Sequence, residues 1–436
     1  MNQLLKHEDT FAKAYATLNE RQREAVDCIE GPVLVVAGPG TGKTQILAVR
    51  IGTILSRTDT LPENILCLTY TDAGTVAMRR RLASFIGPDA YRVGIYTFHA
   101  FCNEVIQSNP DYFGRRELEP VSDLEKVTIV ENILHKLPAN HILKKFTGDF
   151  SNDTSRLLGL FETMKKENWE PATIHQAIDT YLNDIPNREE FKYQRPNKSK
   201  GIALGDLKLE LIKAETEKME RLRAASALFD DYQEQLRIAG RYDYADMILW
   251  VLRAFATDEN LLRNYQERYL YFLVDEFQDT NGAQNEILQQ LTSFWDVPNV
   301  FAVGDDDQSI YEFQGARVKN ILDFYNRYSP DIKLVVLTDN YRSTQSILDA
   351  SKAVIDKNNE RLINKLKGLS KNLQAKDAER VAHNYMPEVH QYKNIAQEEA
   401  GVMHQIEELN KSGVPLNEIA VLYHRHAQAD NLIRLC

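Results

Sequence analysis

Cysteine is scarce in this chain. The 4 cysteines, Cys28, Cys67, Cys102 and Cys436, include no closely spaced pair. Their arrangement excludes a zinc ribbon, whose ligands come in pairs a few residues apart, and it excludes a disulfide framework. A reducing cytoplasm is therefore the environment that the sequence favours.

Long hydrophobic runs are also missing. The first twenty residues carry charges throughout and lack the apolar core of a signal peptide. No later segment approaches the ~18 apolar residues that a membrane span needs. We therefore expect a cytoplasmic protein that does not contact a membrane.

The chain has no excess of basic residues. Lysine and arginine total 52 against 63 aspartates and glutamates, and the formal net charge is -11. This balance suits a soluble protein and argues against a wholly basic coat for nucleic acid, although it does not exclude a local basic surface.

Short apolar runs recur along the chain and alternate with helical patterns. Runs rich in Val, Ile and Leu that end in Gly, Asp, Thr or an aromatic residue are typical of parallel strands buried on both faces. Seven segments fit this description: "PVLVVAGPG", "NILCLTYTD", "RVGIYTFHA", "LYFLVDEFQD", "NVFAVGDDD", "IKLVVLTDN" and "EIAVLYHRH". The predicted fold class is α/β.

The order of these segments predicts the domain organisation. A length of 436 residues allows two or three domains. Residues 103–225 have helical periodicity and no buried-strand pattern, so we expect them to form a helical insertion. The first α/β domain then comprises residues 1–102 and 226–330, and a second α/β unit covers 331–436.

The segment "VLVVAGPGTGKT" predicts a phosphate-binding site. It reads as a buried strand, a glycine-rich turn and a Lys-Thr pair that opens a helix, so backbone N–H groups and the helix N-terminus face anionic oxygens. Lys43 would reach the terminal phosphates and Thr44 would ligate Mg²⁺. The other expected phosphate-binding residues are Gly38, Gly40, Thr41 and Gly42. Ala37 replaces the usual first glycine, and a plain turn with a surface lysine would not explain the whole series.

The segment "YFLVDEFQDT" predicts the catalytic acids. Asp275 at a strand end would hold Mg²⁺ through water, and Glu276 would orient or deprotonate the attacking water beside the γ-phosphate. Two adjacent acids alone are weak evidence, but beside the phosphate loop they indicate nucleotide hydrolysis.

The segment "VGDDDQSIYEFQGA" is not a calcium loop. Such a loop needs glycine at its sixth position and an acid at its twelfth, whereas counting from Asp305 places Ile310 and Ala316 there. A polar turn whose aromatic residues pack in the core is the alternative that the residues alone leave open.

Six segments in order resemble the motifs of UvrD/Rep/PcrA-type DNA helicases of superfamily 1A. They are "LNERQREAV", "CLTYTDAGTVAMRRRL", "YTFHAF", "VDEFQDT", "VGDDDQSIYEFQGA" and "LTDNYRST". The resemblance implies a RecA-like P-loop NTPase domain with a helical insertion, followed by part of a second RecA-like domain. It also implies an ATP- and Mg²⁺-dependent DNA repair helicase that acts on single-stranded DNA and duplex junctions, with 3'-to-5' polarity.

The resemblance also implies roles for individual residues. Gln22 would hydrogen-bond the adenine edge and Tyr341 would stack on the adenine. Gln308 would reach the γ-phosphate, as would Arg342 from the second domain. Candidate contacts to single-stranded DNA, by base stacking or to its backbone, are Tyr70, Thr71, Thr97, His99, Tyr311 and Phe313.

The chain departs from the family pattern in three places. Gln45 follows the Lys-Thr pair where the family usually has a basic residue, and Phe313 and Gln314 replace the usual Trp and Arg. The family's last boxes, including a second phosphate-contacting arginine, are not among these 436 residues. We therefore expect the N-terminal part of a longer helicase, whose pathway and protein partners the sequence does not identify.

Two other functions compete with this interpretation. A nucleotide-responsive module that binds single-stranded DNA without complete turnover would share these motifs. A metabolic P-loop kinase would not explain the matches at Gln22 and Tyr341 or the aromatic residues.

Overall fold

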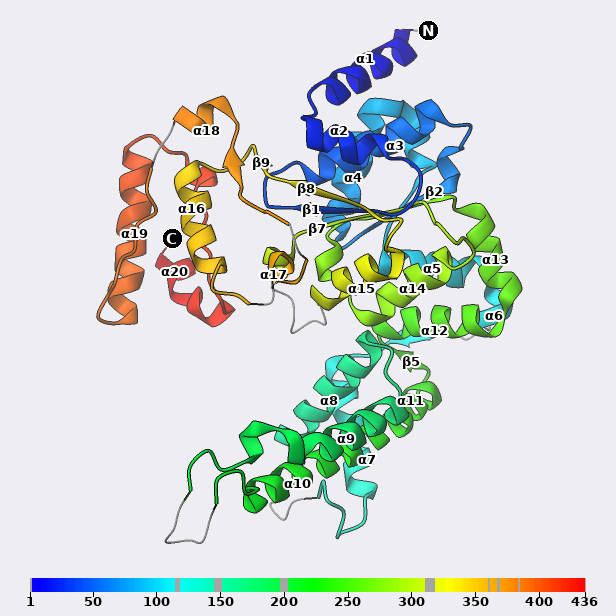
Figure 1. The fold of residues 1–436 in the computed structure, drawn as a ribbon, viewed down its shortest axis with the longest axis vertical. Helices are drawn as coiled ribbons and strands as arrows, with labels where there is room; N and C mark the ends of the chain where they lie inside the picture. Colours follow the sequence, from blue (N-terminus) through cyan, green and yellow to red (C-terminus); the bar gives the residue numbers. More distant parts are fainter. Residues whose placement is uncertain are drawn as a thin grey trace.

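A six-stranded parallel sheet is the centre of the first α/β domain (Figure 1). The computed structural model describes residues 2–113, 118–144, 151–196, 203–309, 318–359, 361–366, 369–382 and 385–435. The strand order is β3-β2-β6-β7-β1-β8. The strands are β1 (Val33–Ala37), β2 (Ile65–Thr69), β3 (Gly94–Thr97), β6 (Tyr271–Val274), β7 (Val300–Gly304) and β8 (Lys333–Leu337).

Both faces of this sheet are buried, as the continuous apolar runs predict. Alternate residues of β1 enter different cores: Leu34 and Val36 face one, and Val35 faces the other. The first core is covered by α5 (Phe98–Ser108), α12 (Tyr244–Thr257), α13 (Glu259–Arg268), α14 (Gly282–Thr292) and α15 (Val318–Tyr328). The second is covered by α2 (Glu20–Asp27), α3 (Lys43–Arg57) and α4 (Asp72–Ile86), with α1 (Asn2–Ala16) outside them. The expected α/β fold is confirmed.

Strand β8 lies in the first sheet, although it follows the expected boundary at residue 331. It pairs with β1 along its whole length, with Val335 opposite Val35. The backbone of the run "KLVVL" hydrogen-bonds to the edge of β1 that would otherwise be unpaired, and its apolar side chains pack in the core. The strand therefore extends this sheet. The chain leaves this sheet only after Leu337.

The helical insertion extends further than expected. Its core includes Phe229, Tyr232 and Leu236, which lie beyond the expected end at residue 225, whereas Phe101 of α5 packs in the first core. Its helices are α7 (Asp123–Lys136), α8 (Ser151–Lys166), α9 (Pro171–Asp184), α10 (Leu209–Ala227) and α11 (Phe229–Ile238). The short α6 (Pro110–Phe113) and the paired strands β4 (Glu119–Pro120) and β5 (Arg241–Tyr242) join it to the first domain.

The C-terminal unit begins beside the sheet and ends in loosely packed helices (Figure 1). Its elements are β9 (Asp339–Asn340), α16 (Gln345–Ile355), α17 (Leu362–Lys365), β10 (Gln374–Ala375), α18 (Ala378–Ala382), α19 (Ile395–Lys411) and α20 (Asp430–Leu435). The strand predicted in "EIAVLYHRH" does not form. Leu422 is 95% exposed, and no described strand pairs with this segment. An apolar run alone does not make a strand, because a strand needs a partner for its backbone groups.

None of the described helices combines the length and apolar character needed to cross a membrane.

Candidate nucleotide-binding site

The residues predicted to bind nucleotide meet at one edge of the sheet. Strands β6, β7, β1 and β8 are neighbours in parallel register, with Val36 opposite Gly304 and Ala37 opposite Leu337. The phosphate loop, the Asp275-Glu276 pair and the aspartates after β7 each follow the carboxyl end of one of these strands. They therefore lie side by side. In open α/β sheets this edge is where ligands bind.

The phosphate loop has the backbone conformation that its glycines permit. Gly40 and Gly42 have φ values of 71° and 88°, in the left-handed region that favours glycine. Gly42 is the N-cap of α3, so Lys43 and Thr44 open the helix as predicted. The buried Thr41 hydroxyl donates to the Gly38 carbonyl over 2.7 Å, so its side chain supports the loop from inside.

The C-terminal unit contacts this loop directly. The backbone N–H of Tyr341 donates to the Gly40 carbonyl over 2.9 Å, and the buried Asn340 amide donates to the Pro39 carbonyl. A Cβ at Gly40 would lie 2.7 Å from the Arg342 Cβ. Glycine is therefore required at Gly40 for two reasons, because the backbone has positive φ and because a second chain segment approaches closely.

Gln22 and Tyr341 are brought together by Asn19, which sequence reasoning missed. The Gln22 amide donates to the Thr41 carbonyl over 2.8 Å, and Gln22 forms a reciprocal capping box with Asn19 at the start of α2. The Asn19 amide donates to the Tyr341 hydroxyl over 2.9 Å. The two predicted adenine contacts thus flank one side of the loop.

Lys43 forms an ion pair with Glu276. The Lys43 Nζ lies 2.5 Å from the Glu276 Oε2, and the lysine side chain is 10% exposed against 35% for the glutamate. Glu276 has φ 46° and ψ 48°, a left-handed conformation that costs about 1–2 kcal/mol in a residue with a side chain. An incoming phosphate can compete for the lysine, which would leave the carboxylate free to bind water.

The carboxyl groups of Asp275 and Asp279 are buried and lie within the electrostatic influence of Glu276. Burial, then the charge of Glu276, raises the pKa of Asp275 to about 6, and the same causes raise the pKa of Asp279 to about 6. The Asp279 Oδ1 atom is buried without a hydrogen-bond partner in the described part of the chain. A divalent cation would offset the cost of these charges, so the residues present fit Mg²⁺ held by Asp275 and Thr44.

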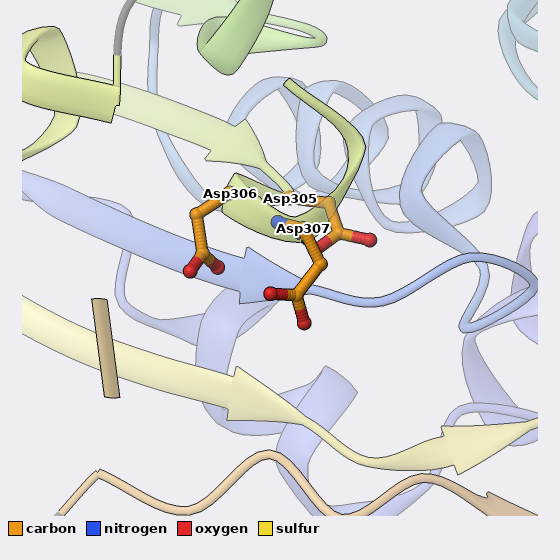
Figure 2. A group of neighbouring side chains, drawn as sticks. All are labelled: Asp305, Asp306 and Asp307. Carbon is orange, nitrogen blue, oxygen red and sulfur yellow. Dashed lines mark hydrogen bonds between the residues drawn. The ribbon is translucent and has the colours of Figure 1, made fainter. Parts of the chain in front are cut away.

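The three aspartates that follow β7, Asp305, Asp306 and Asp307, are called here the aspartate turn (Figure 2). Asp305 is the N-cap of the short 3-10 helix Asp306–Gln308. The Gln308 amide donates to Asp305 Oδ2 over 2.5 Å. The turn is neutralised by protein cations: Lys371 contacts all three carboxylates, and Arg361 contacts Asp307. Neither cation was identified from the sequence, where each lies more than fifty positions away.

The candidate DNA contacts follow β2 and β3. Thr71 and Thr97 are N-caps whose hydroxyls accept from backbone N–H groups of α4 and α5, so both have a structural role. Burial lowers the pKa of the half-buried His99, which opposes its protonation. Tyr70 is half-buried at the end of β2. Tyr311 and Phe313 lie outside the described residues.

The fold and the arrangement of the site indicate a class of nucleotide-binding protein. A parallel sheet with a phosphate loop after β1 and acids after β6 is the RecA-like α/β fold of helicases. The profile of the UvrD/REP helicase N-terminal domain matches residues 18–329, and that of the UvrD-like helicase C-terminal domain matches residues 335–434. The chain belongs to the UvrD/REP helicase family.

Several curated relatives carry the same name. The chain is 30% identical to the ATP-dependent DNA helicase PcrA of Bacillus subtilis over 413 residues, which are 94% of this chain and 48% of that protein. Its identity to PcrA of Staphylococcus aureus is 28% over 432 residues, 98% of this chain and 49% of the relative. The chain therefore spans about half the length of the curated relatives it matches.

Proposed function

We propose that this chain supplies the ATP-hydrolysing part of a DNA helicase that moves along single-stranded DNA towards duplex junctions. The 3'-to-5' direction, a role in DNA repair and a cytoplasmic location are predictions that come with family membership. The PcrA relatives are named as ATP-dependent DNA helicases, which supports ATP as the nucleotide.

The observation that carries this proposal is the sharing of one loop between two chain segments. The first domain provides Lys43 and Glu276 at the loop, while Asn340 and Tyr341 of the C-terminal unit bond to its carbonyls. A nucleotide bound there contacts both parts of the chain, so its arrival and hydrolysis can change how they are held together.

Each residue has a distinct task in the proposed reaction. The loop N–H groups and Lys43 bind the phosphates, and Glu276, once released from Lys43, orients the attacking water and accepts its proton. Arg342 approaches the loop from the C-terminal unit and would stabilise the charge that develops on the γ-phosphate. Mg²⁺, held by Thr44 and Asp275, would neutralise phosphate charge.

The proposed DNA track follows from the same geometry. Tyr70 and His99 follow β2 and β3, in the same sheet as the strands that end at the nucleotide site. Stacking on an aromatic side chain is worth about 1–3 kcal/mol per base and tolerates any sequence, as a translocase requires.

Steady-state ATP hydrolysis, with and without single-stranded DNA, tests the proposal. We expect DNA to stimulate turnover by the wild-type chain, and we expect Glu276→Gln to lower turnover by about 10²–10⁴ while nucleotide binding remains. Normal hydrolysis by Glu276→Gln would remove Glu276 from its proposed role. Failure of the wild type to bind Mg-ATP would remove the site.

A second candidate is a nucleotide-responsive DNA-binding module without complete turnover. One observation favours it: α18 and α19 contain no buried residue. A C-terminal unit with so little packing can take part in binding DNA without transmitting force from ATP hydrolysis to the DNA. Mg-ATP and DNA binding without hydrolysis would select this candidate.

A further inference from the structure

Lys371 occupies the centre of the aspartate turn. Its side chain is 1% exposed, and its ammonium lies 2.8 Å from an oxygen of Asp306 and 2.9 Å from an oxygen of Asp307, with a further ion pair to Asp305. One carboxylate oxygen from each aspartate lies within 4.8 Å of the others. Three carboxylates this close repel one another unless a cation lies among them.

The protein supplies that cation itself. Burial alone would lower the pKa of Lys371, but Asp305, Asp306 and Asp307 raise it above its ordinary value, so the ammonium stays charged. Lys371 therefore takes the position that a metal ion would hold in a carboxylate cage. Because the ammonium is part of the C-terminal unit, its ion pairs attach that unit to the aspartate turn of the first domain. A metal ion in the same position would not do so.

A second cation and a backbone group strengthen the tie. Arg361, 4% exposed, donates from Nε and Nη2 to the two oxygens of Asp307 over 2.6 and 2.8 Å. The Leu362 N–H donates to Asp306 Oδ2 over 2.8 Å, and its side chain is fully buried in the first core. Leu373 packs so closely on Gly38 that a Cβ there would lie 2.7 Å from it. We call residues 361–366 and 369–373 the anchor segment.

The aspartate turn is in turn bonded to the catalytic acid. The Asp305 N–H donates to the Gln278 Oε1 over 2.8 Å. The Gln278 amide donates to the Glu276 Oε2 over 2.8 Å, the same oxygen that accepts from Lys43. Asp305 also accepts from the Gln308 amide. A continuous series of hydrogen bonds thus joins the anchor segment to Glu276.

We propose that Lys371 is a positioning residue that fixes the aspartate turn and thereby couples the anchor segment of the C-terminal unit to Glu276. Lys371 contacts neither the phosphate loop nor the acid and acts through Asp305. The attachment itself is independent of catalysis, whereas its effect on turnover rests on the proposed function. Separate measurements test the attachment and its coupling to Glu276.

Amide hydrogen exchange of the nucleotide-free chain tests the attachment. In Lys371→Met we expect anchor-segment amides to exchange at least about tenfold faster, because removing one partner of a buried ion pair is costly. The matched control is Lys376→Met, at an exposed lysine of the same unit, and it should exchange like the wild type. Unchanged protection of the anchor segment in Lys371→Met would overturn the proposal.

A milder variant decides the case if Lys371→Met does not fold. Asp307→Asn keeps Lys371 with two carboxylates and weakens only the third contact and the Arg361 pair. We expect the same amides to exchange about threefold faster in this variant. Faster exchange spread evenly over the sheet, without a preference for the anchor segment, would contradict the proposed attachment.

ATP turnover tests the effect on Glu276. In Lys371→Met we expect kcat to fall about tenfold while KM for ATP changes less than about threefold, because the residues that bind nucleotide are intact. Lys371→Arg, which keeps the charge, should recover most of kcat. An unchanged kcat in Lys371→Met, or an equal fall in Lys376→Met, would overturn the positioning role. If the wild type does not hydrolyse ATP, the proposed function fails, and the exchange experiment still decides the attachment.

Discussion

Two lysine–carboxylate sites lie at the same edge of the sheet and differ in exposure. Lys43 pairs with Glu276, whose side chain is 35% exposed, whereas Lys371 pairs with Asp305 and Asp306, which are fully buried. The first pair has one carboxylate, and its lysine opens the helix that follows the glycine loop. The second has three carboxylates around one ammonium.

The difference shows how burial decides what an ion pair can do. An accessible pair contributes little to stability and can exchange its partner, so Lys43 can leave Glu276 for a phosphate. A buried pair cannot exchange without leaving a charge uncompensated in a low-dielectric site. We therefore propose that the same chemistry serves ligand exchange at Lys43 and lasting attachment at Lys371.

The largest effect is expected at Arg342, which approaches the phosphate loop from the C-terminal unit. Arg342→Ala should lower ATP turnover by about 10³–10⁵, because a cation that approaches the γ-phosphate from a second segment stabilises the transition state. Single-turnover hydrolysis measures this, with Arg380→Ala on the exposed α18 as the control. A loss of less than about threefold would mean that the first domain hydrolyses ATP alone.

A matched pair of variants compares the two lysines by stability. Lys371→Met should lower the free energy of unfolding by about 3–5 kcal/mol, because it leaves buried carboxylates unpaired. Lys43→Met should change it by less than about 1 kcal/mol. Denaturant unfolding of both variants measures the contrast, and equal losses would contradict the distinction between an exchangeable and a permanent pair.

A smaller effect is expected at Asp279, where burial and the charge of Glu276 outweigh the opposing charge of Lys43. Its pKa is raised to about 6 in the folded chain by burial and by Glu276, so the ionised form destabilises the native state above about pH 6, and this cost disappears as the pH falls towards 4. Asp279→Asn should therefore stabilise the nucleotide-free chain by about 1 kcal/mol at pH 7.5, since solvent screens part of the cost. Unfolding experiments at pH 7.5 and 5 should show the gain shrinking at the lower pH. A gain of equal size at both would assign it to another cause.

The smallest effect is expected at Tyr341. Tyr341→Phe removes the hydroxyl that accepts from Asn19 and keeps the aromatic ring. Nucleotide affinity should change less than about threefold, because the lost bond is exposed and stacking needs only the ring. Tyr341→Ala, titrated beside it with a fluorescent nucleotide, should weaken binding more. Equal losses in the two variants would assign the effect to the hydroxyl.

The open site was predictable from sequence and the buried one was not, for a physical reason. The phosphate loop and the Asp275-Glu276 pair are contiguous segments whose local conformation carries the chemistry. Lys371 is separated from Asp305 by 66 positions, and their contact depends on how the C-terminal unit folds back on the first domain. Its sequence neighbourhood, "GLSKNLQ", contains no signal that distinguishes it from a surface lysine.

The errors in the predicted fold have the same origin. The runs "KLVVL" and "AVLY" look alike as sequence, yet the first forms β8 because the edge of β1 is available and the second remains irregular. Strand formation depends on a partner that local pattern does not specify. The insertion boundary was misplaced similarly, because only tertiary packing assigns Phe229 and Leu236 to the insertion core.

The most direct test of the account is a titration of Mg-ATP into the wild-type chain and Lys43→Met. The account predicts that the wild type binds one nucleotide and that Lys43→Met, still folded, binds at least about a hundredfold more weakly, because the lysine exchanges Glu276 for phosphate. Equal affinity in the two proteins would contradict the account, since the Lys43–Glu276 pair would then not be the exchangeable site.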